Sequence, residues 1–198
     1  MSQIYFVRHA KIETGLGINH NEDLSAAGVK QLPLLGKFFE DKNVETVFHS
    51  PLKRALQTAK TVAGPNASLV EDVRLRERQW GPSAKTWDEV HSKLSEMDIV
   101  TRYAFQPEGG ESWQEFEERT SAFWQQKINL SKNTAIVAHE GTLRVLLPYV
   151  LRHQLGGFEN SLRWSVQQNF ALGSVSLLDT VTMDFSKEIF VPGDSNER

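Results

Sequence analysis

Two short apolar runs that each end at a histidine constrain this chain more than any other feature. Residues 4–7 lead directly into Arg8 and His9, and residues 135–138 lead into His139. Short β-prone runs of this kind are typical of buried strands, and open α/β sheets bind their ligands beyond the carboxyl ends of the strands. The sequence therefore predicts two histidines and an arginine at one edge of a sheet, which together suggest a phosphate site.

Strand-like runs alternate with helical patterns along the rest of the chain. This order predicts an α/β fold with a mainly parallel central sheet and helices on both faces. Ser50 is the predicted N-cap of the second helix, with Pro51 at its first position. We expect strands at 4–7, 44–48, 68–71, 135–138, 170–178 and 181–191, and helices at 25–39, 50–62, 112–130 and 142–151.

Length and composition predict one domain over residues 1–198. With 198 residues, 39% of them hydrophobic, the chain is long enough to bury a substantial core. Residues 80–110 mix polar and aromatic side chains, and we expect a partly helical excursion that covers the site. Residues 192–198 are predicted to form a flexible tail.

The same composition narrows the functional classes. The net charge of −3 gives no support for a nucleic-acid partner, and the absence of cysteine rules out zinc-thiolate sites and thiol nucleophiles. No leader peptide is evident, and no window approaches the roughly 18 apolar residues that a membrane helix needs. We therefore expect a cytoplasmic protein without a membrane partner, and the oligomeric state stays open.

Three basic side chains are candidates for phosphate binding. Arg54 falls in the first turn of a predicted helix, where free backbone N–H groups and the helix dipole already favour an anion. Arg8 and His139 follow strands that would end at the same edge of the sheet. Two guanidinium groups and an imidazole can stabilise the charge of a PO3 group without a metal ion.

A nucleophile and an acid complete the predicted chemistry. A neutral His9 can attack phosphorus directly and form a phosphohistidine, because an imidazole nitrogen is nucleophilic near neutral pH. Expelling an alcohol requires a proton donor, and Glu77 is the predicted acid. The indole of nearby Trp80 would raise the pKa of this carboxyl.

Five separate stretches, which together span residues 4–144, resemble the histidine phosphatase superfamily in its phosphoglycerate mutase-like branch 1. This resemblance implies a three-layer α/β sandwich, a phosphorylated His9, phosphate ligands at Arg8, Arg54 and His139, and a proton donor at Glu77. The matching stretches are Arg8-His9-Ala10, the run Ser50, Arg54, Ala55, Gln57, Thr58, Ala59, the acid-bearing segment 75–81, the segment 108–112, and His139 with Arg144.

The chain departs from that family pattern at two places. The family usually has Asn after its first histidine to contact phosphate, and we expect the Thr14 hydroxyl or the Gly15 N–H to replace it. Glu140 stands where the family commonly has a glycine whose N–H faces phosphate. We place Glu140 in the phosphate site, with its carboxylate turned away or neutralised by Lys11.

The predicted function is a metal-independent phosphomonoesterase that acts on small phosphorylated metabolites through a phosphohistidine and needs no cofactor. One alternative is a cofactor-dependent phosphoglycerate mutase, and a second is a phospho-ligand binding module without catalysis. The resembling mutases carry Asn at the position of Gly141 and more basic residues in the excursion, where this chain offers Arg78 and Arg102 as substrate-binding candidates. The remaining histidines are assigned structural roles: His20, His49, His91 and His153.

Overall fold

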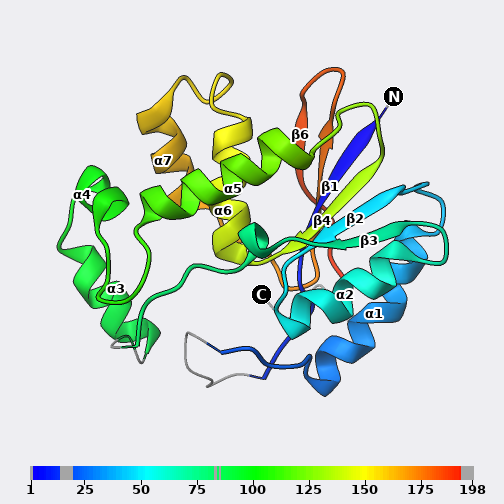
Figure 1. The fold of residues 1–198 in the computed structure, drawn as a ribbon, viewed down its shortest axis with the longest axis horizontal. Coiled ribbons are helices and arrows are strands. Elements are labelled where there is room, and N and C mark those ends of the chain that lie inside the picture. Colours follow the sequence, from blue (N-terminus) through cyan, green and yellow to red (C-terminus); the bar gives the residue numbers. More distant parts are fainter. Residues whose placement is uncertain (1, 14–19, 83, 85, 193–198) are drawn as a thin grey trace.

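The computed structural model describes residues 2–13, 20–82, 84 and 86–192. In these residues six strands form one sheet in the order β3-β2-β4-β1-β5-β6 (Figure 1). The first four strands pair in parallel, whereas β5 runs antiparallel to β1 and β6 antiparallel to β5. The mainly parallel sheet is therefore confirmed. Its strands are β1 (Gln3–Arg8), β2 (Thr46–His49), β3 (Ser68–Glu71), β4 (Thr134–Ala138), β5 (Val175–Asp179) and β6 (Phe185–Phe190).

Helices cover both faces of the sheet, so the predicted three-layer sandwich is also confirmed (Figure 1). One face carries α1 (Ala26–Phe39) and α2 (Lys53–Ala63). The other carries α5 (Trp113–Lys127) and α6 (Glu140–Val150), with α7 (Phe158–Gln167) packed against α6. The predicted excursion is partly helical, because it contains α3 (Trp87–Ser95) and α4 (Ile99–Ala104).

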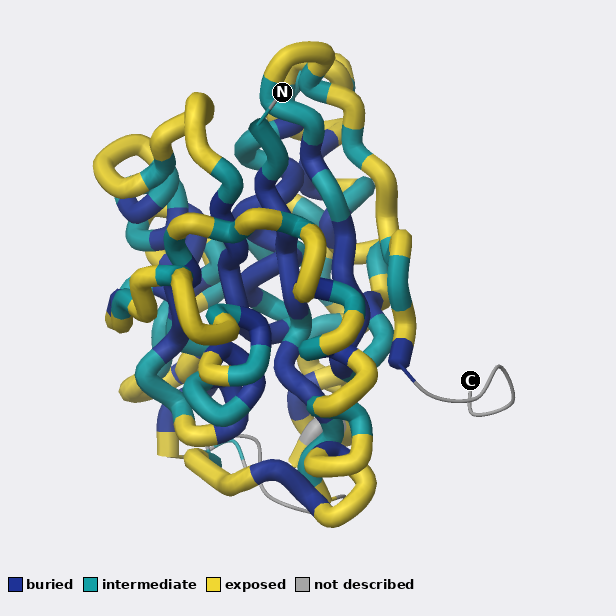
Figure 2. Tube along the Cα trace, turned by 90° about the vertical axis from the view of Figure 1, so that its right-hand side faces the viewer, coloured by how far each residue is buried: buried dark blue, intermediate teal, exposed yellow. Residues whose placement is uncertain are grey.

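The alternation of side chains in β1 explains why both faces need a cover. Ile4 and Phe6 point into the core beneath α5 and α6, whereas Tyr5 and Val7 point into the core beneath α1 and α2. All four are at most 1% exposed. A strand that is apolar on both sides cannot face water on either one, and Figure 2 shows the sheet as the buried centre of the molecule.

The strand register brings the predicted site together. Arg8 pairs with Ala138, and the N–H of His9 donates to the Ala138 carbonyl at 3.0 Å, so the residues after β1 and β4 lie side by side. On the other side of β4, the N–H of Ser50 donates to the Val137 carbonyl at 3.1 Å. The segments that follow β1, β2 and β4 therefore leave the sheet next to one another.

Several predicted boundaries are wrong. Ser50 is not the N-cap of α2, which begins at Lys53 after Leu52. Its hydroxyl accepts from the N–H of Leu52, ahead of the helix, and also contacts His139. Helix α6 begins at Glu140 rather than at residue 142, and β5 and β6 are shorter than the strands predicted at 170–178 and 181–191.

Helix α7 was not predicted, and it belongs to the layer that covers the sheet. Of the expected tail, residues 193–198 lie outside the described part of the chain. None of the helices in the described ranges combines the length and the apolar character that crossing a membrane requires.

Candidate active site

The hydrogen bonds of His9 fix which ring nitrogen is the nucleophile. Its Nδ1 lies 2.7 Å from the carbonyl oxygen of Ala10, which can only accept, so Nδ1 carries the proton. Its Nε2 accepts from Arg54 Nε at 3.2 Å, and a guanidinium can only donate. Burial, reinforced by the charges of Arg54 and Arg8, holds the pKa of His9 well below 6.5. His9 is therefore neutral at physiological pH, with the Nε2 lone pair directed at the basic cluster.

Two buried donors beside His9 have no partner in the described part of the chain. These are Arg8 Nε and His139 Nδ1, the latter in the tautomer in which Ser50 Oγ accepts from the N–H of Leu52 and donates to His139 Nε2. The His9 and His139 rings are 5.1 Å apart between centroids, and the charge of Arg8 acts on both. Buried polar groups are nearly always hydrogen-bonded, so unused donors around one nitrogen mark the place of an anionic ligand. The arrangement suits a phosphoryl group.

Ser50 orients the second histidine. Its Oγ lies 2.7 Å from His139 Nε2, and this bond leaves Nδ1 of the ring for a ligand. Burial, followed by the influence of His9, keeps the pKa of His139 well below 6.5, so this ring is also neutral. The sequence prediction missed this role of Ser50, although Ser50 is part of the run that carries the family resemblance.

Glu77 lies against the N-terminus of α6. Its Oε2 accepts from the N–H of Gly141 at 3.1 Å, and its Oε1 accepts from the N–H of Arg78 at 2.9 Å. Burial raises the pKa of Glu77, while these two N–H groups and the charges of Arg54 and Arg8 oppose the shift. A carboxyl with a raised pKa inside a cationic site is suited to donate a proton.

Glu140 neutralises one of the predicted phosphate ligands. Its Oε2 lies 2.8 Å from Arg8 Nη1, and both side chains are partly buried. The same Arg8 nitrogen also donates to the carbonyl of Phe170. The carboxylate is thus neutralised as expected, but by Arg8 rather than by Lys11.

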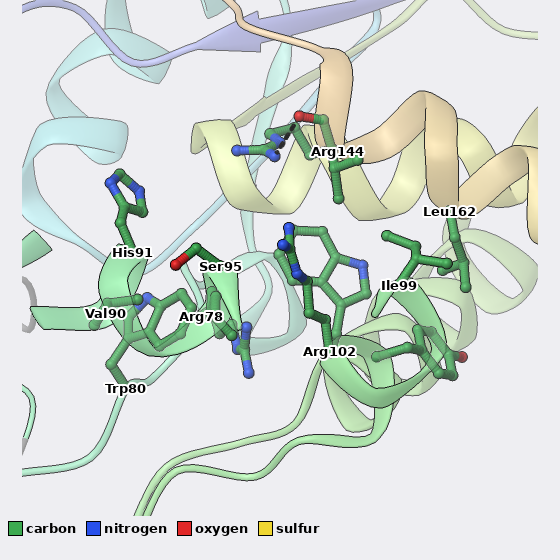
Figure 3. A pocket seen from close by; sticks show the side chains of 13 residues that line it. Arg78, Trp80, Val90, His91, Ser95, Ile99, Arg102, Arg144 and Leu162 are labelled. Atoms are coloured by element: carbon green, nitrogen blue, oxygen red, sulfur yellow. Dashed lines mark hydrogen bonds between the residues drawn. The ribbon is translucent and has the colours of Figure 1, made fainter. Parts of the chain in front are cut away.

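Arg78 and Arg102, the substrate-binding candidates of the predicted excursion, line one cavity of about 410 Å³ (Figure 3), and Arg78 directly follows Glu77 in the chain. Arg78 is 3% exposed, and its guanidinium stacks on Trp80 at 3.9 Å from the ring centroid. Arg102 enters the same cavity from α4. Arg144 of α6 joins them, so this helix contributes to both the phosphate site and the cavity.

Two expectations for the loop after β1 have different outcomes. Thr14 and Gly15, the predicted replacements for the family's Asn, lie outside the described residues. His20, to which we assigned a structural role, lies beside the site, because Arg54 Nη1 donates to its carbonyl at 2.9 Å. Burial, followed by the charge of Arg54, lowers the pKa of the His20 ring. No sequence signal distinguishes this histidine from the other unassigned ones.

Comparison with known proteins identifies the family of this chain. The model of the histidine phosphatase superfamily (branch 1) matches residues 4–180, and the chain belongs to this family. It is 32% identical over 160 residues to a putative phosphoserine phosphatase 2 of Hydrogenobacter thermophilus, which covers 74% of this chain and 77% of the relative. It is 27% identical over 166 residues to a 2,3-bisphosphoglycerate-dependent phosphoglycerate mutase of Cytophaga hutchinsonii, covering 76% of this chain and 78% of the relative.

Among solved structures, the alpha-ribazole phosphatase of Shigella flexneri has the same fold. The TM-score is 0.74 at 20% sequence identity, and the match covers 98% of this chain and 100% of the other. The predicted family, the phosphoglycerate mutase-like fold and the phosphatase class are therefore confirmed.

Proposed function

We propose that this protein hydrolyses phosphate monoesters of small metabolites through a phosphohistidine on His9. The observation that carries the proposal is the Nε2 lone pair of a neutral, buried His9, directed at Arg54 and accompanied by unused donors on Arg8 and His139. Glu77 supplies the acid at the same site.

In the first step, His9 Nε2 forms a bond to phosphorus while the bond from phosphorus to the alcohol oxygen breaks. The proton of the Glu77 carboxyl passes to the leaving oxygen, so the alcohol departs neutral and Glu77 becomes a carboxylate. Arg8, Arg54 and His139 hold the phosphoryl oxygens during the transfer.

In the second step, water replaces the departed alcohol. The Glu77 carboxylate takes a proton from this water as its oxygen attacks phosphorus, and the bond from phosphorus to His9 Nε2 breaks. Inorganic phosphate leaves, and both residues return to their starting protonation states. One carboxyl thus acts as acid and then as base, which a pKa raised by burial permits.

Glu77 argues against a module that binds phosphate without reacting. Burying a carboxyl between Arg78 and the first turn of α6 costs stability, and binding an anion gains nothing from a carboxyl there. Turnover, by contrast, requires the Glu77 carboxyl as a proton donor. The mutase alternative shares the first step, and it differs only in whether the bound product or water accepts the phosphoryl group.

A panel of phosphorylated metabolites, assayed with a chelator present, tests the proposal. Wild type should release inorganic phosphate, and His9→Ala should abolish the release. Incubation with 3-phosphoglycerate separates the two catalytic alternatives, since a mutase forms 2-phosphoglycerate faster than phosphate. Dependence on an added divalent ion would contradict the metal-independent scheme. The described residues contain no group of three or more His, Cys, Asp or Glu arranged to hold a metal ion. Cytoplasmic location stays a prediction.

A further inference from the structure

The cavity that Arg78 and Arg102 line has a cationic part and an apolar part (Figure 3). Leu94 of α3, Ile99 of α4 and Leu162 of α7 supply aliphatic surface, and the ring of Trp113 adds an aromatic wall. Arg78, Arg102 and Arg144 supply three positive charges. No aspartate or glutamate is among the described residues that line it.

The three arginines are held in place by backbone oxygens. Arg78 donates to the carbonyls of Glu111 and Phe105, Arg144 donates to those of Ser165 and Val166, and Arg102 Nε donates to Met97. Within the described part of the chain, none of the three guanidinium groups lies within ion-pair distance of a carboxylate. The carbonyls fix the direction of each side chain. Carboxylates act on Arg78 and Arg144 only from beyond ion-pair distance, Glu111 on the first and Glu140 on the second.

A buried charge that lacks a direct ion-pair partner is costly. Burial lowers the pKa of Arg78 to about 10 and also lowers the pKa of Arg144. Folded proteins pair such charges or use them for a ligand. Among the residues that the structure describes, none bonds to the two Nη atoms of Arg102, which are placed for a forked contact, the geometry in which a guanidinium binds a carboxylate.

The position of the cavity indicates which part of a substrate would enter it. Arg78 follows Glu77 directly, and Arg144 lies one helical turn after Glu140, close enough for Glu140 and Glu77 to act on its pKa. Glu77 is the group that protonates the leaving oxygen in the proposed function. The remainder of the alcohol therefore extends into this cavity.

We propose that the cavity selects substrates whose alcohol carries a carboxylate on an apolar or aromatic body, and that Arg102 binds this carboxylate. This inference rests on the proposed function and adds the class of substrate. The absence of a carboxylate from the described lining disfavours an alcohol that carries an ammonium group, so a phosphorylated amino acid is a poorer fit than a phosphorylated hydroxy acid.

Three aryl phosphates of similar size test the charge preference. They are 4-methylphenyl phosphate and its analogues with a carboxymethyl or an aminomethyl group in place of methyl. We expect kcat/KM for the carboxymethyl ester to exceed that for the methyl ester by about tenfold, which is the size of one charged hydrogen bond. The aminomethyl ester should fall below the methyl ester.

Arg102→Gln should reduce the preference for the carboxymethyl ester to within about threefold of the methyl ester. Arg163→Gln is the matched control, because it removes the same charge from an exposed position on α7, where Arg163 pairs with Glu159 at the surface. The control should keep the wild-type ratio. Equal ratios in wild type and in Arg102→Gln would overturn the inference.

Binding of the product alcohol separates this inference from the proposed function. The fluorescence of Trp80 and Trp113, which line the cavity, should report binding of 4-hydroxyphenylacetate to wild type and weaker binding to Arg102→Gln. Absence of binding to wild type would overturn the inference while ester hydrolysis still supported the phosphatase. Binding without any hydrolysis of the three esters would overturn the phosphatase and support the anionic cavity.

Discussion

Gly141 sets the position of the catalytic acid, and Gly141→Ala should displace that acid. A Cβ at residue 141 would lie 2.1 Å from Glu77 Oε1 and 3.0 Å from its Cδ, whereas ordinary contacts begin at 3.4 Å. The carboxyl must therefore withdraw by roughly 1 Å, and it loses the 3.1 Å hydrogen bond from the Gly141 N–H. A displacement of about 1 Å costs on the order of 100-fold in rate.

The loss should depend on the leaving group. For an alkyl phosphate, phosphoenzyme formation measured by rapid quench in a single turnover should slow about 100-fold. For 4-nitrophenyl phosphate it should slow by less than about threefold, because a stable phenolate needs little protonation. The matched control is Gly36→Ala in α1, where the new Cβ lies 3.3 Å from Thr61 Cγ2 and far from Glu77 in the fold. A wild-type rate for the alkyl ester, or equal losses for both esters, would refute the reasoning.

Three further predictions concern charge. Glu77→Gln should slow alkyl esters far more than 4-nitrophenyl phosphate, and it should raise Tm more at pH 8 than at pH 5. The raised pKa means that the fold favours protonated Glu77, so ionisation of this one carboxyl destabilises wild type as pH rises above 4.5; a Tm gain that shrinks as pH rises would contradict this. Glu140→Gln releases Arg8 from a 2.8 Å ion pair and should lower KM roughly tenfold, whereas a higher KM would mean that Glu140 aids binding. Because His9 and His139 have lowered pKa values, the unfolded chain binds more protons below pH 6.5. In Glu77→Gln, which removes the opposing contribution of Glu77, thermal unfolding should show stability falling as pH drops through that value. Constant stability between pH 7.5 and 5.5 would mean that these rings are not buried and neutral.

The sequence was sufficient for the central residues because their positions follow from strand pairing. Once β1 and β4 pair in parallel with Arg8 beside Ala138, His9 and His139 are neighbours without further assumption. Arg54 was predicted from its place in the first turn of a helix, and the helix begins one residue before it. Local patterns thus determined the elements, and topology determined which ends meet.

Side-chain partners were harder to predict because they depend on contacts between distant segments. Ser50 has the sequence signature of an N-cap, yet its hydroxyl forms a hydrogen bond with His139, which is 89 positions away in the chain. Lys11 was the expected partner of Glu140, but the ion pair joins Glu140 to Arg8, the residue that ends the paired strand. Helix α7 was missed because its N-cap is Gly157, which has a φ of 107° and no side chain to cap the helix.

Trapping the covalent intermediate tests the account most directly. Enzyme mixed with a ³²P-labelled phosphate ester and quenched within one turnover should carry label that is stable in base and lost in acid, as expected for phosphohistidine. Peptide mapping should place the label on His9, and His9→Ala should carry none. Continued release of phosphate without a labelled His9, or with the label on another residue, would contradict the mechanism.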